Sequence, residues 1–341
     1  MDTLKKAISD VVSRKDLSQA EISSVMEIIM EGEATPAQIG ALLMGLRMKG
    51  ETVDEITGAA KVMREKAIRI HVNLSPKESL VDTCGTGGDG AQTFNVSTTA
   101  AFVVAGAGVK VAKHGNRSVS SRSGSADVLE ALGVNLALSP EDVARAVETI
   151  GMGFMFAPDL HPAMKYAIGP RREIGIRTIF NVLGPLTNPA WANVQLLGIY
   201  DPMLTRLLAE VLGRLGSKRA WVVHGEGGLD ELSLLGKSYV AQWDKNEVKE
   251  FVIRPEDAGF KPCKAEDLKG GDAEENAEIL KGILSGKTGP KRDMVLLNVG
   301  AAIFLADRAK SLKEGVLLAA ESIDSMEAMK KLEALKAFSM R

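Results

Sequence analysis

The sequence predicts an α/β protein in which a small helical domain precedes a larger domain with a mostly parallel central sheet. Over residues 1–73, apolar residues recur at helical spacing behind helix-capping signals. From residue 74 to residue 341, short β-prone runs alternate with helical stretches, a pattern typical of a parallel sheet covered by helices. A chain of 341 residues is long enough to give each of these two domains a core.

Three capping signals organise the first domain. Ser18 to Glu21 and Thr52 to Glu55 are capping boxes, and Thr35 stands before a proline at the first helical position. Apolar residues follow each signal at a spacing of three or four, and Gly50 predicts the end of the second of these helices. We therefore expect short helices that pack on one another.

The second domain is predicted from its apolar runs. Ser139 and Pro140 predict the start of a helix, the polar residues 244–247 predict the turn of an antiparallel hairpin over 239–253, and residues 293–306 predict a buried helix. The glycine- and lysine-rich segments at 270–271 and 287–291 predict loops. Strands are predicted at residues 80–81, 109–112, 135–138, 195–200 and 219–224.

Composition excludes several classes of protein. The chain has 42 Lys and Arg against 44 Asp and Glu, a net charge of −2, whereas a nucleic-acid or membrane-surface binder normally carries a basic excess. It has only two cysteines, Cys84 and Cys263, and no metal-binding cysteine motif. Its N-terminus has no signal-peptide pattern, and its longest apolar run, 100–109, is too short to span a bilayer. We expect a soluble, cytoplasmic protein.

Positive charge is concentrated in one stretch of this nearly neutral chain. Residues 90–126 contain no acidic residue but include Lys110, Lys113, Arg117 and Arg122. One short basic segment suits a small polyanionic ligand better than a long polyanion, which needs a wider basic face.

A glycine-rich segment at 82–90 precedes this basic stretch. Its glycines let backbone N–H groups approach an anion closely. Read as a dinucleotide fingerprint it fails, because no helix opens at the third glycine and no acidic residue follows about twenty positions on. The alternative is a tight structural turn.

The next segment, Asn95 to Thr99, places hydroxyl groups at a helix start, which favours an anion site. The alternative is that Ser97 or Thr98 is an ordinary helix cap.

Residues 113–127 follow a predicted strand and precede a predicted helix. They combine cations with five serines, and in α/β proteins this position at a strand end is where ligands bind. The alternative is a solvated loop.

The turn at 224–231 also follows a strand and carries Asp230 and Glu231, oxygen ligands of the kind that Mg²⁺ prefers beside a phosphate. The alternative is an acidic surface turn. Near the middle of the chain, Arg171 offers a bidentate partner for a carboxylate, although a lone Arg or His is often structural.

Taken together, these motifs resemble those of the anthranilate phosphoribosyltransferase family of tryptophan biosynthesis. The similarity runs from about residue 4 to about residue 335, and the order and spacing of the motifs fit throughout. The motifs are CGTGGDG at 84–90, NVST at 95–98, KHGNRSVSSRSGSAD at 113–127, HPAM at 161–164, GPRREIGIRTIFNVLGPLTNP at 169–189 and GLDELS at 228–233.

The resemblance implies a fold of the nucleoside phosphorylase and phosphoribosyltransferase type, with helices near 166–187 packed on the helical domain and the site between the domains. It implies a homodimer. It also implies transfer of the phosphoribosyl group of 5-phosphoribosyl 1-diphosphate (PRPP) to the amine of anthranilate, with Mg²⁺ as cofactor and pyrophosphate as the second product.

The resemblance also implies roles for particular residues. Those for anthranilate are Gly85, Asn116, His161 and Arg171, with Arg171 on the carboxylate, and those for Mg²⁺ are Ser97, Asp230 and Glu231. Those for PRPP are Gly85, Gly88, Asp89, Thr93, Asn95, Val96, Ser97, Thr98, Lys113, His114, Gly115, Asn116, Arg117, Ser118, Val119, Ser120, Ser121 and Ser125.

The chemistry of the reaction agrees with these assignments. An aromatic amine is neutral at pH 7, so catalysis should consist mainly of positioning and of stabilising the leaving diphosphate. No general base is assigned. The main alternative is a pyrimidine nucleoside phosphorylase of the same fold, which needs only one phosphate. A second alternative, a non-catalytic relative that binds nucleic acid, should be distinctly basic, and this chain is not.

Overall fold

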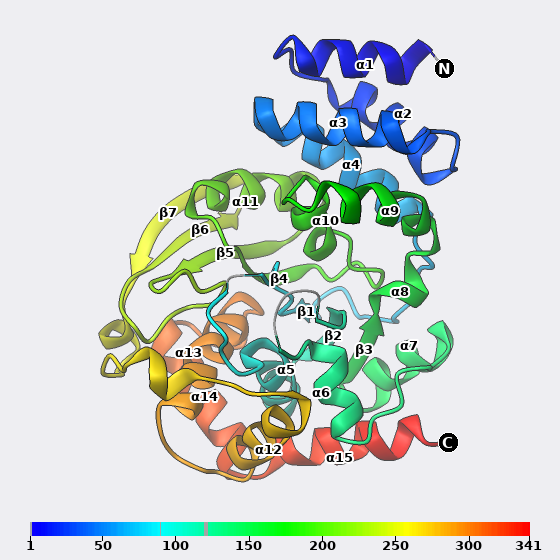
Figure 1. The fold of residues 1–341 in the computed structure, drawn as a ribbon. Helices are drawn as coiled ribbons and strands as arrows, with labels where there is room; N and C mark the ends of the chain where they lie inside the picture. Colours follow the sequence, from blue (N-terminus) through cyan, green and yellow to red (C-terminus); the bar gives the residue numbers. More distant parts are fainter. Residues whose placement is uncertain (1, 89, 119–121) are drawn as a thin grey trace.

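The computed structural model describes residues 2–88, 90–118 and 122–341 and has two parts, a layer of helices and a larger α/β unit (Figure 1). The strands are β1 (Leu80–Asp82), β2 (Lys110–Gly115), β3 (Met152–Phe156), β4 (Val194–Gly198), β5 (Arg219–Gly225), β6 (Ser238–Asp244) and β7 (Glu247–Ile253). The helices are α1 (Asp2–Val12), α2 (Gln19–Met30), α3 (Pro36–Lys49), α4 (Val53–Lys66), α5 (Val96–Gly106), α6 (Ser125–Ala131), α7 (Pro140–Thr149), α8 (Ala157–Leu160), α9 (Lys165–Ile174), α10 (Phe180–Leu186), α11 (Thr205–Arg214), α12 (Ala273–Leu284), α13 (Pro290–Leu305), α14 (Leu312–Asp324) and α15 (Glu327–Ser339).

The capping signals of the first domain act as predicted. Ser18, Thr35 and Thr52 each accept a hydrogen bond from the backbone N–H three residues further on, and the side chain at that position returns the contact. Gly50 ends α3 with a φ of +89°. The helix α1 lies ahead of the first capping signal and was not separately predicted. Farther along the chain, α9 packs against α2 and α3, and α10 packs against α4.

The central sheet has the order β3-β2-β1-β4-β5-β6-β7. Its first five strands are parallel, and β6 and β7 complete it as the predicted antiparallel hairpin. The hairpin turn places Lys245 and Asn246 in the left-handed region, with φ values of 51° and 63°, as a tight two-residue hairpin turn requires. The buried helix predicted at 293–306 is α13.

One predicted strand is wrong. Residues 135–138 form an extended connection between α6 and α7, and their N–H groups bond to side chains instead of a neighbouring strand: Asn135 N–H to Ser339 Oγ, and Ala137 N–H to Asn135 Oδ1. The strand that pairs with β2 on the side away from β1 is β3, which was not predicted from the sequence. Because both segments are short and apolar, local propensity does not decide which of them pairs with β2.

The central parallel strands β4 and β5 bury side chains on both faces of the sheet. Leu196 and Val223 belong to the core under α5 and α12–α15, whereas their neighbours Leu197 and Val222 belong to the core shared with α11 and the N-terminal helices. This alternation is the pleat of a parallel sheet that is covered by helices on both faces.

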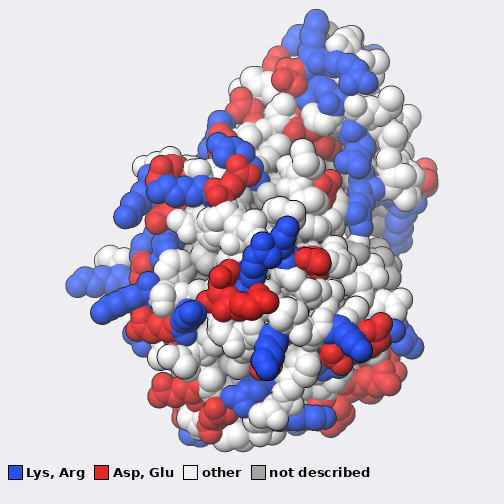
Figure 2. All heavy atoms as spheres, turned by 90° about the vertical axis from the view of Figure 1, so that its left-hand side faces the viewer, with Lys and Arg blue, Asp and Glu red and all other residues white. Residues whose placement is uncertain are grey.

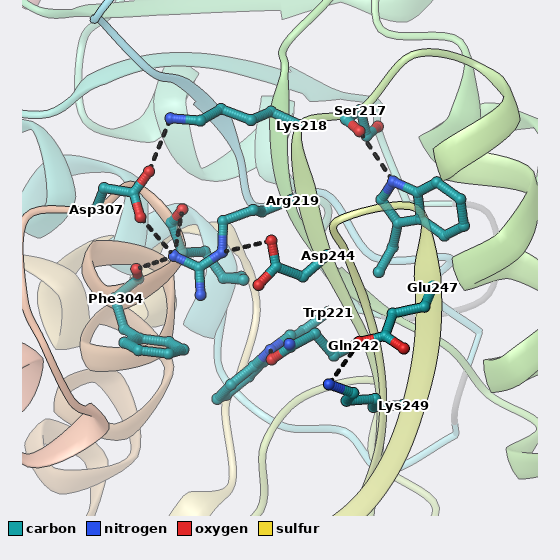
Figure 3. Close-up of polar contacts among 12 residues, drawn as sticks. Ser217, Lys218, Arg219, Trp221, Gln242, Asp244, Glu247, Lys249, Phe304 and Asp307 are labelled. Atoms are coloured by element: carbon teal, nitrogen blue, oxygen red, sulfur yellow. Dashed lines mark hydrogen bonds and ion pairs between the residues drawn. The ribbon is translucent and has the colours of Figure 1, made fainter.

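The amino-terminal end of β5 is fastened to the end of α13 by a polar cluster (Figure 3). The guanidinium of Arg219 donates to the Phe304 carbonyl at 2.9 Å and to Asp307 at 2.8 Å, and Lys218 contacts the other oxygen of Asp307 at 2.7 Å. Here Arg219 is a second donor to a carbonyl at the helix end, which also accepts the N–H of Asp307 at 3.1 Å. The cluster lies at the opposite end of β5 from the turn that carries Asp230.

The face that carries the β6–β7 hairpin mixes basic and acidic side chains (Figure 2). It does not present the broad basic surface of a nucleic-acid binder. Among the described residues, no helix is both long enough and apolar enough to cross a lipid bilayer.

Candidate active site

The candidate site lies at the carboxyl ends of the parallel strands, around β1. Chain connections run from β1 towards β2 and β3 on one side, while β4 and β5 lie on the other. In open α/β sheets, ligands bind at such a switch point, because the loops after neighbouring strands diverge there. The glycine-rich loop leaves β1 at this point and leads into α5.

The glycine-rich loop is held by the strands on its other side. Thr86 N–H donates to the Gly198 carbonyl at 2.9 Å, and Gly87 N–H donates to Asp230 Oδ2 at 2.7 Å. A Cβ on Gly85 would lie 2.6 Å from Asp230 Oδ2, so only glycine permits this approach. Gly88 has a φ of +70°, which also favours glycine.

The start of α5 lies against the loop that follows β2. Asn95 stands at the N-cap position but makes no capping bond; its amide donates to the Ser123 carbonyl at 3.3 Å. Ser97 and Thr98 lie in the first turn of α5, so neither is its cap, and Thr98 Oγ1 donates to Ser125 Oγ at 3.0 Å. The amino terminus of α5, with its positive dipole end, is therefore directed at the site.

Lys113, on β2, is a buried cation beside the first turn of α5. Its side chain is 1% exposed, and its Nζ donates to Ser97 Oγ at 3.3 Å. Among the described residues it has no carboxylate within ion-pair distance. A lysine in such surroundings favours a site that receives an anion.

Arg117 is committed elsewhere. Its guanidinium pairs with Glu130 and Asp127 of α6. Asp127 also accepts the N–H groups of Ser118 and Gly124 and so shapes the loop. The acid-free stretch 90–126 is thus partly balanced by two acids that lie just beyond its end.

Asp230 and Glu231 lie on the turn after β5, on the side of the glycine-rich loop. The bond from Gly87 N–H to Asp230 brings this pair to the loop, and Ser97 lies at the start of α5, which the same loop enters. The structure therefore brings together the three segments in which the sequence predicts PRPP and metal ligands.

Of the predicted anthranilate residues, His161 lies beside His114, a residue that is predicted for PRPP. The rings of His114 and His161 lie 5.1 Å apart, and the buried Nε2 atom of each has no hydrogen-bond partner among the residues that the structure describes. Arg171, on α9, lies over the ring of Phe180 at 5.1 Å, and its guanidinium makes no hydrogen bond or ion pair with another described residue. Burial lowers its pKa.

The remaining predicted residues line the same loops. Thr93 pairs with Lys269 in an isolated bridge, Val96 is buried in the first turn of α5, and Gly115 ends β2. Asn116 is exposed, and its carbonyl accepts Ala126 N–H at 3.2 Å. The predictions for Asp89, Val119, Ser120 and Ser121 lie outside the described residues.

Three polar residues around the site were not singled out from the sequence. Asp82 and Asn188 are buried and hydrogen-bonded to each other, and Arg177 donates to the Gly88 carbonyl and lies over the Tyr200 ring at 3.9 Å. All three lie inside segments named above, Asp82 in the glycine-rich segment 82–90 and Arg177 and Asn188 in the motif at 169–189. The positions of Asp82 in the glycine-rich segment and of Asn188 before a proline were the available signal.

The two histidines give a pH prediction. Burial lowers the pKa of His114 to about 3 and that of His161 to about 4, so both rings are neutral at pH 7. Of the four histidine C2–H resonances, two should stay unchanged from pH 8 to pH 5.5, and His114→Gln and His161→Gln should each delete one of them. Because these folded-state values lie below the unfolded value of about 6.5, stability should fall as pH drops below about 6.5. A midpoint near 6.5 for either assigned resonance would contradict the burial argument.

Comparison with known proteins covers almost the whole chain. Residues 5–67 match the model of the helical bundle domain of a glycosyl transferase family, and residues 77–329 match the model of its a/b domain. An anthranilate phosphoribosyltransferase of Symbiobacterium thermophilum is 56% identical over 338 residues, covering 99% of this chain and 98% of the relative.

Solved structures agree. The crystal structure of anthranilate phosphoribosyltransferase from Thermus thermophilus has a TM-score of 0.93 and 46% identity, covering 98% of this chain and 99% of that one. The Saccharomyces cerevisiae enzyme in complex with PRPP and Mg has a TM-score of 0.89 and 30% identity, covering 99% and 98%. The yeast enzyme has also been solved with 4-fluoroanthranilate, at a TM-score of 0.88 and 28% identity, with the same coverage.

Proposed function

Since this chain belongs to the anthranilate phosphoribosyltransferase family, we propose that it transfers the phosphoribosyl group of PRPP to the amine of anthranilate. The products are N-(5-phosphoribosyl)anthranilate and pyrophosphate. One observation supports this most: the glycine-rich loop, the start of α5, Lys113 and the Asp230–Glu231 turn meet at one end of the sheet. A diphosphate needs this combination of backbone donors, a cation and oxygen ligands for a metal.

The cofactor is Mg²⁺, and the donor set suits it. Asp230, Glu231 and the Ser97 hydroxyl offer only oxygen atoms, and no group of three or more His, Cys, Asp or Glu side chains that could hold a metal by itself occurs among the described residues. Few protein ligands are what Mg²⁺ requires when a substrate phosphate supplies others. When bound, Mg²⁺ neutralises charge on the diphosphate.

The residues of the chain then position the leaving group. The N–H groups of the glycine-rich loop and of the first turn of α5 donate to diphosphate oxygens, and Lys113 supplies positive charge from a buried position. As the bond between the ribose carbon and the diphosphate breaks, negative charge grows on the oxygens that these donors face. The proposed PRPP ligands are those expected from the sequence; for Arg117 the contribution is its backbone, because its guanidinium is paired with α6.

Anthranilate is placed from the opposite side. Arg171 binds its carboxylate in a bidentate contact, and Asn116, His161 and Gly85 line its path. Both histidines nearby are neutral, and the amine is neutral as well, so the attack needs no strong base. The comparisons support this activity and not the alternative of a pyrimidine nucleoside phosphorylase.

A fluorescence assay with anthranilate, PRPP and Mg²⁺ tests the proposal. We expect anthranilate fluorescence to decay with release of one pyrophosphate per anthranilate consumed, and chelation of the metal by EDTA to abolish the decay. No turnover, together with phosphate-dependent cleavage of uridine or thymidine, would replace the proposal with the nucleoside phosphorylase.

We propose a homodimer assembled through the helical layer, whose α1 and α3 expose Val12 (67%) and Met48 (69%). Sedimentation analysis should give twice 36.3 kDa, and Val12→Glu with Met48→Glu should lower that mass; a wild-type monomer would contradict the assembly.

We place the domain boundary near residue 73, with the helices near 166–187 on the helical side, so limited proteolysis should cut first within 67–79. Both substrates are anions that do not cross a bilayer unaided, so we expect cell fractionation to recover the enzyme with cytoplasmic markers.

A further inference from the structure

A carboxylate lies fully buried beneath the candidate site, and the reaction as proposed above does not use it. Asp82, the last residue of β1, is 0% exposed, and no lysine, arginine or histidine among the described residues lies within ion-pair distance of it. Burial raises its pKa to about 6. Burying a carboxylate is unfavourable unless its oxygen atoms are occupied by hydrogen-bond donors.

Three donors from three different segments occupy these oxygen atoms. Cys84 N–H donates to Oδ1 at 3.0 Å, His114 N–H donates to the same oxygen at 3.3 Å, and the Asn188 amide donates to Oδ2 at 2.7 Å. Cys84 begins the glycine-rich loop, His114 follows Lys113 on β2, and Asn188 follows α10. The carboxylate therefore joins the two anion-binding segments to the segment that comes from the helical layer.

The strand geometry explains why a side chain is needed. β1 ends at Asp82, whereas β2 continues to Gly115. The backbone of β1 turns away into the glycine-rich loop, so it leaves the N–H of His114 without the carbonyl that a longer strand would present. Asp82 Oδ1 takes that place, and the same atom sets where the loop begins.

Asn188 completes the arrangement. It is 2% exposed, its amide also donates to the Ala112 carbonyl on β2 at 2.9 Å, and its Oδ1 accepts the N–H of Ala190 at 2.9 Å. With donor and acceptor both committed, the Asn188 side chain has a single orientation, and Asp82 must accept from it.

We propose that Asp82 and Asn188 are positioning residues for the PRPP site: their buried contact holds the start of the glycine-rich loop in fixed register with Lys113 on β2. This inference rests on the proposed function and extends it to residues that do not touch the substrate. A second bond carries the register to α5, because Thr83 Oγ1 donates to the Ser97 carbonyl at 3.0 Å. Loss of the contact should misplace donors for PRPP and leave the anthranilate side unchanged.

The test compares Asp82→Asn, Asn188→Ala and the double variant with the wild type. In Asp82→Asn, the new side-chain amide places N–H groups opposite one of the N–H donors that the carboxylate now accepts. In Asn188→Ala, the donor to Asp82 Oδ2 is removed. We expect each single variant to raise KM for PRPP, and the Kd for PRPP with Mg²⁺ measured by calorimetry, about tenfold or more, with KM for anthranilate within about twofold. Because both residues act through one contact, the double variant should be no worse than the worse single variant.

Ser339→Ala is the matched control. Ser339 is 2% exposed and accepts Asn135 N–H at 3.0 Å, so the variant removes a buried hydrogen bond far from the site and should lower Tm without changing either KM. Unchanged PRPP affinity in Asn188→Ala, additive effects, or parallel rises in both KM values would overturn the proposal. If Asp82→Asn does not fold, Asn188→Ala decides alone. A wild-type protein that neither turns over nor binds PRPP would instead refute the proposed function.

Discussion

Replacing Asp230 by Asn and Glu231 by Gln in one variant should raise the Mg²⁺ concentration for half-maximal turnover by about 100-fold or more. Each substitution removes a negative charge and keeps the size of the side chain. A hydrogen bond or ligand contact to a charged group contributes about 1.5–3 kcal/mol, so losing two gives an effect of at least this size. The amide oxygen that Asp230→Asn introduces can still accept the N–H of Gly87, so the loop contact survives.

The measurement is the initial rate against Mg²⁺ at saturating PRPP and anthranilate. Glu226→Gln is the matched control, because Glu226 lies on the same turn and its carboxylate accepts the N–H of Lys237 at 2.9 Å, whereas that of Asp230 accepts the N–H of Gly87. The control should titrate like the wild type. A double variant with an unchanged metal titration would assign Asp230 and Glu231 to the structure of the turn instead.

Arg171→Ala should raise KM for anthranilate by about 30-fold or more and change KM for PRPP by less than about threefold. A bidentate contact between a guanidinium and a carboxylate is among the stronger charge-assisted hydrogen bonds, and its loss leaves the carboxylate without a partner in a partly dry site. The guanidinium of Arg171 lies over Phe180 and has no ion-pair partner among the described residues, so the substitution breaks no ion pair within the described part of the chain.

A substrate without the carboxylate sharpens this test. With aniline in place of anthranilate, the wild type and Arg171→Ala should be equally poor, because the group that Arg171 binds is absent. Arg206→Ala, on α11, is the control for removing an arginine, since Arg206 is exposed and pairs with Glu250 at 2.8 Å. Equal losses for PRPP and anthranilate, or an equal loss with aniline, would contradict the placement of Arg171.

Prediction from the sequence succeeded where the signal is local. The caps Ser18, Thr35 and Thr52 depend on a contact between residues three apart, and the hairpin turn at 244–247 depends on four consecutive residues. The segments of the candidate site were also recognised from the sequence, because each is locally rich in glycine, serine or lysine. Prediction failed at 135–138, where strand formation depends on a neighbour that the local residues do not specify.

The role of individual side chains depended on distant residues. From the sequence, Arg117 could be a ligand or a helix partner; its guanidinium is paired because α6 turns Glu130 and Asp127 back towards it. From the sequence, Gly85 could be one more turn residue. The structure requires glycine there, because the Cβ of any other residue would collide with Asp230.

The amino-acid sequence by itself determined the two-part architecture, the helix caps, most of the strands and the three motifs in which we propose anion and metal ligands, because each depends on residues that are neighbours along the chain. Only the tertiary structure decided that the glycine-rich loop and the turn with Asp230 lie side by side, since Gly87 and Asp230, joined by a hydrogen bond, are 143 residues apart. It also decided that Asp82 is a buried junction rather than the end of a strand, because its three donors come from the start of the glycine-rich loop, β2 and the segment after α10. Contacts of this kind follow from how strands stack in a sheet, which no local pattern records.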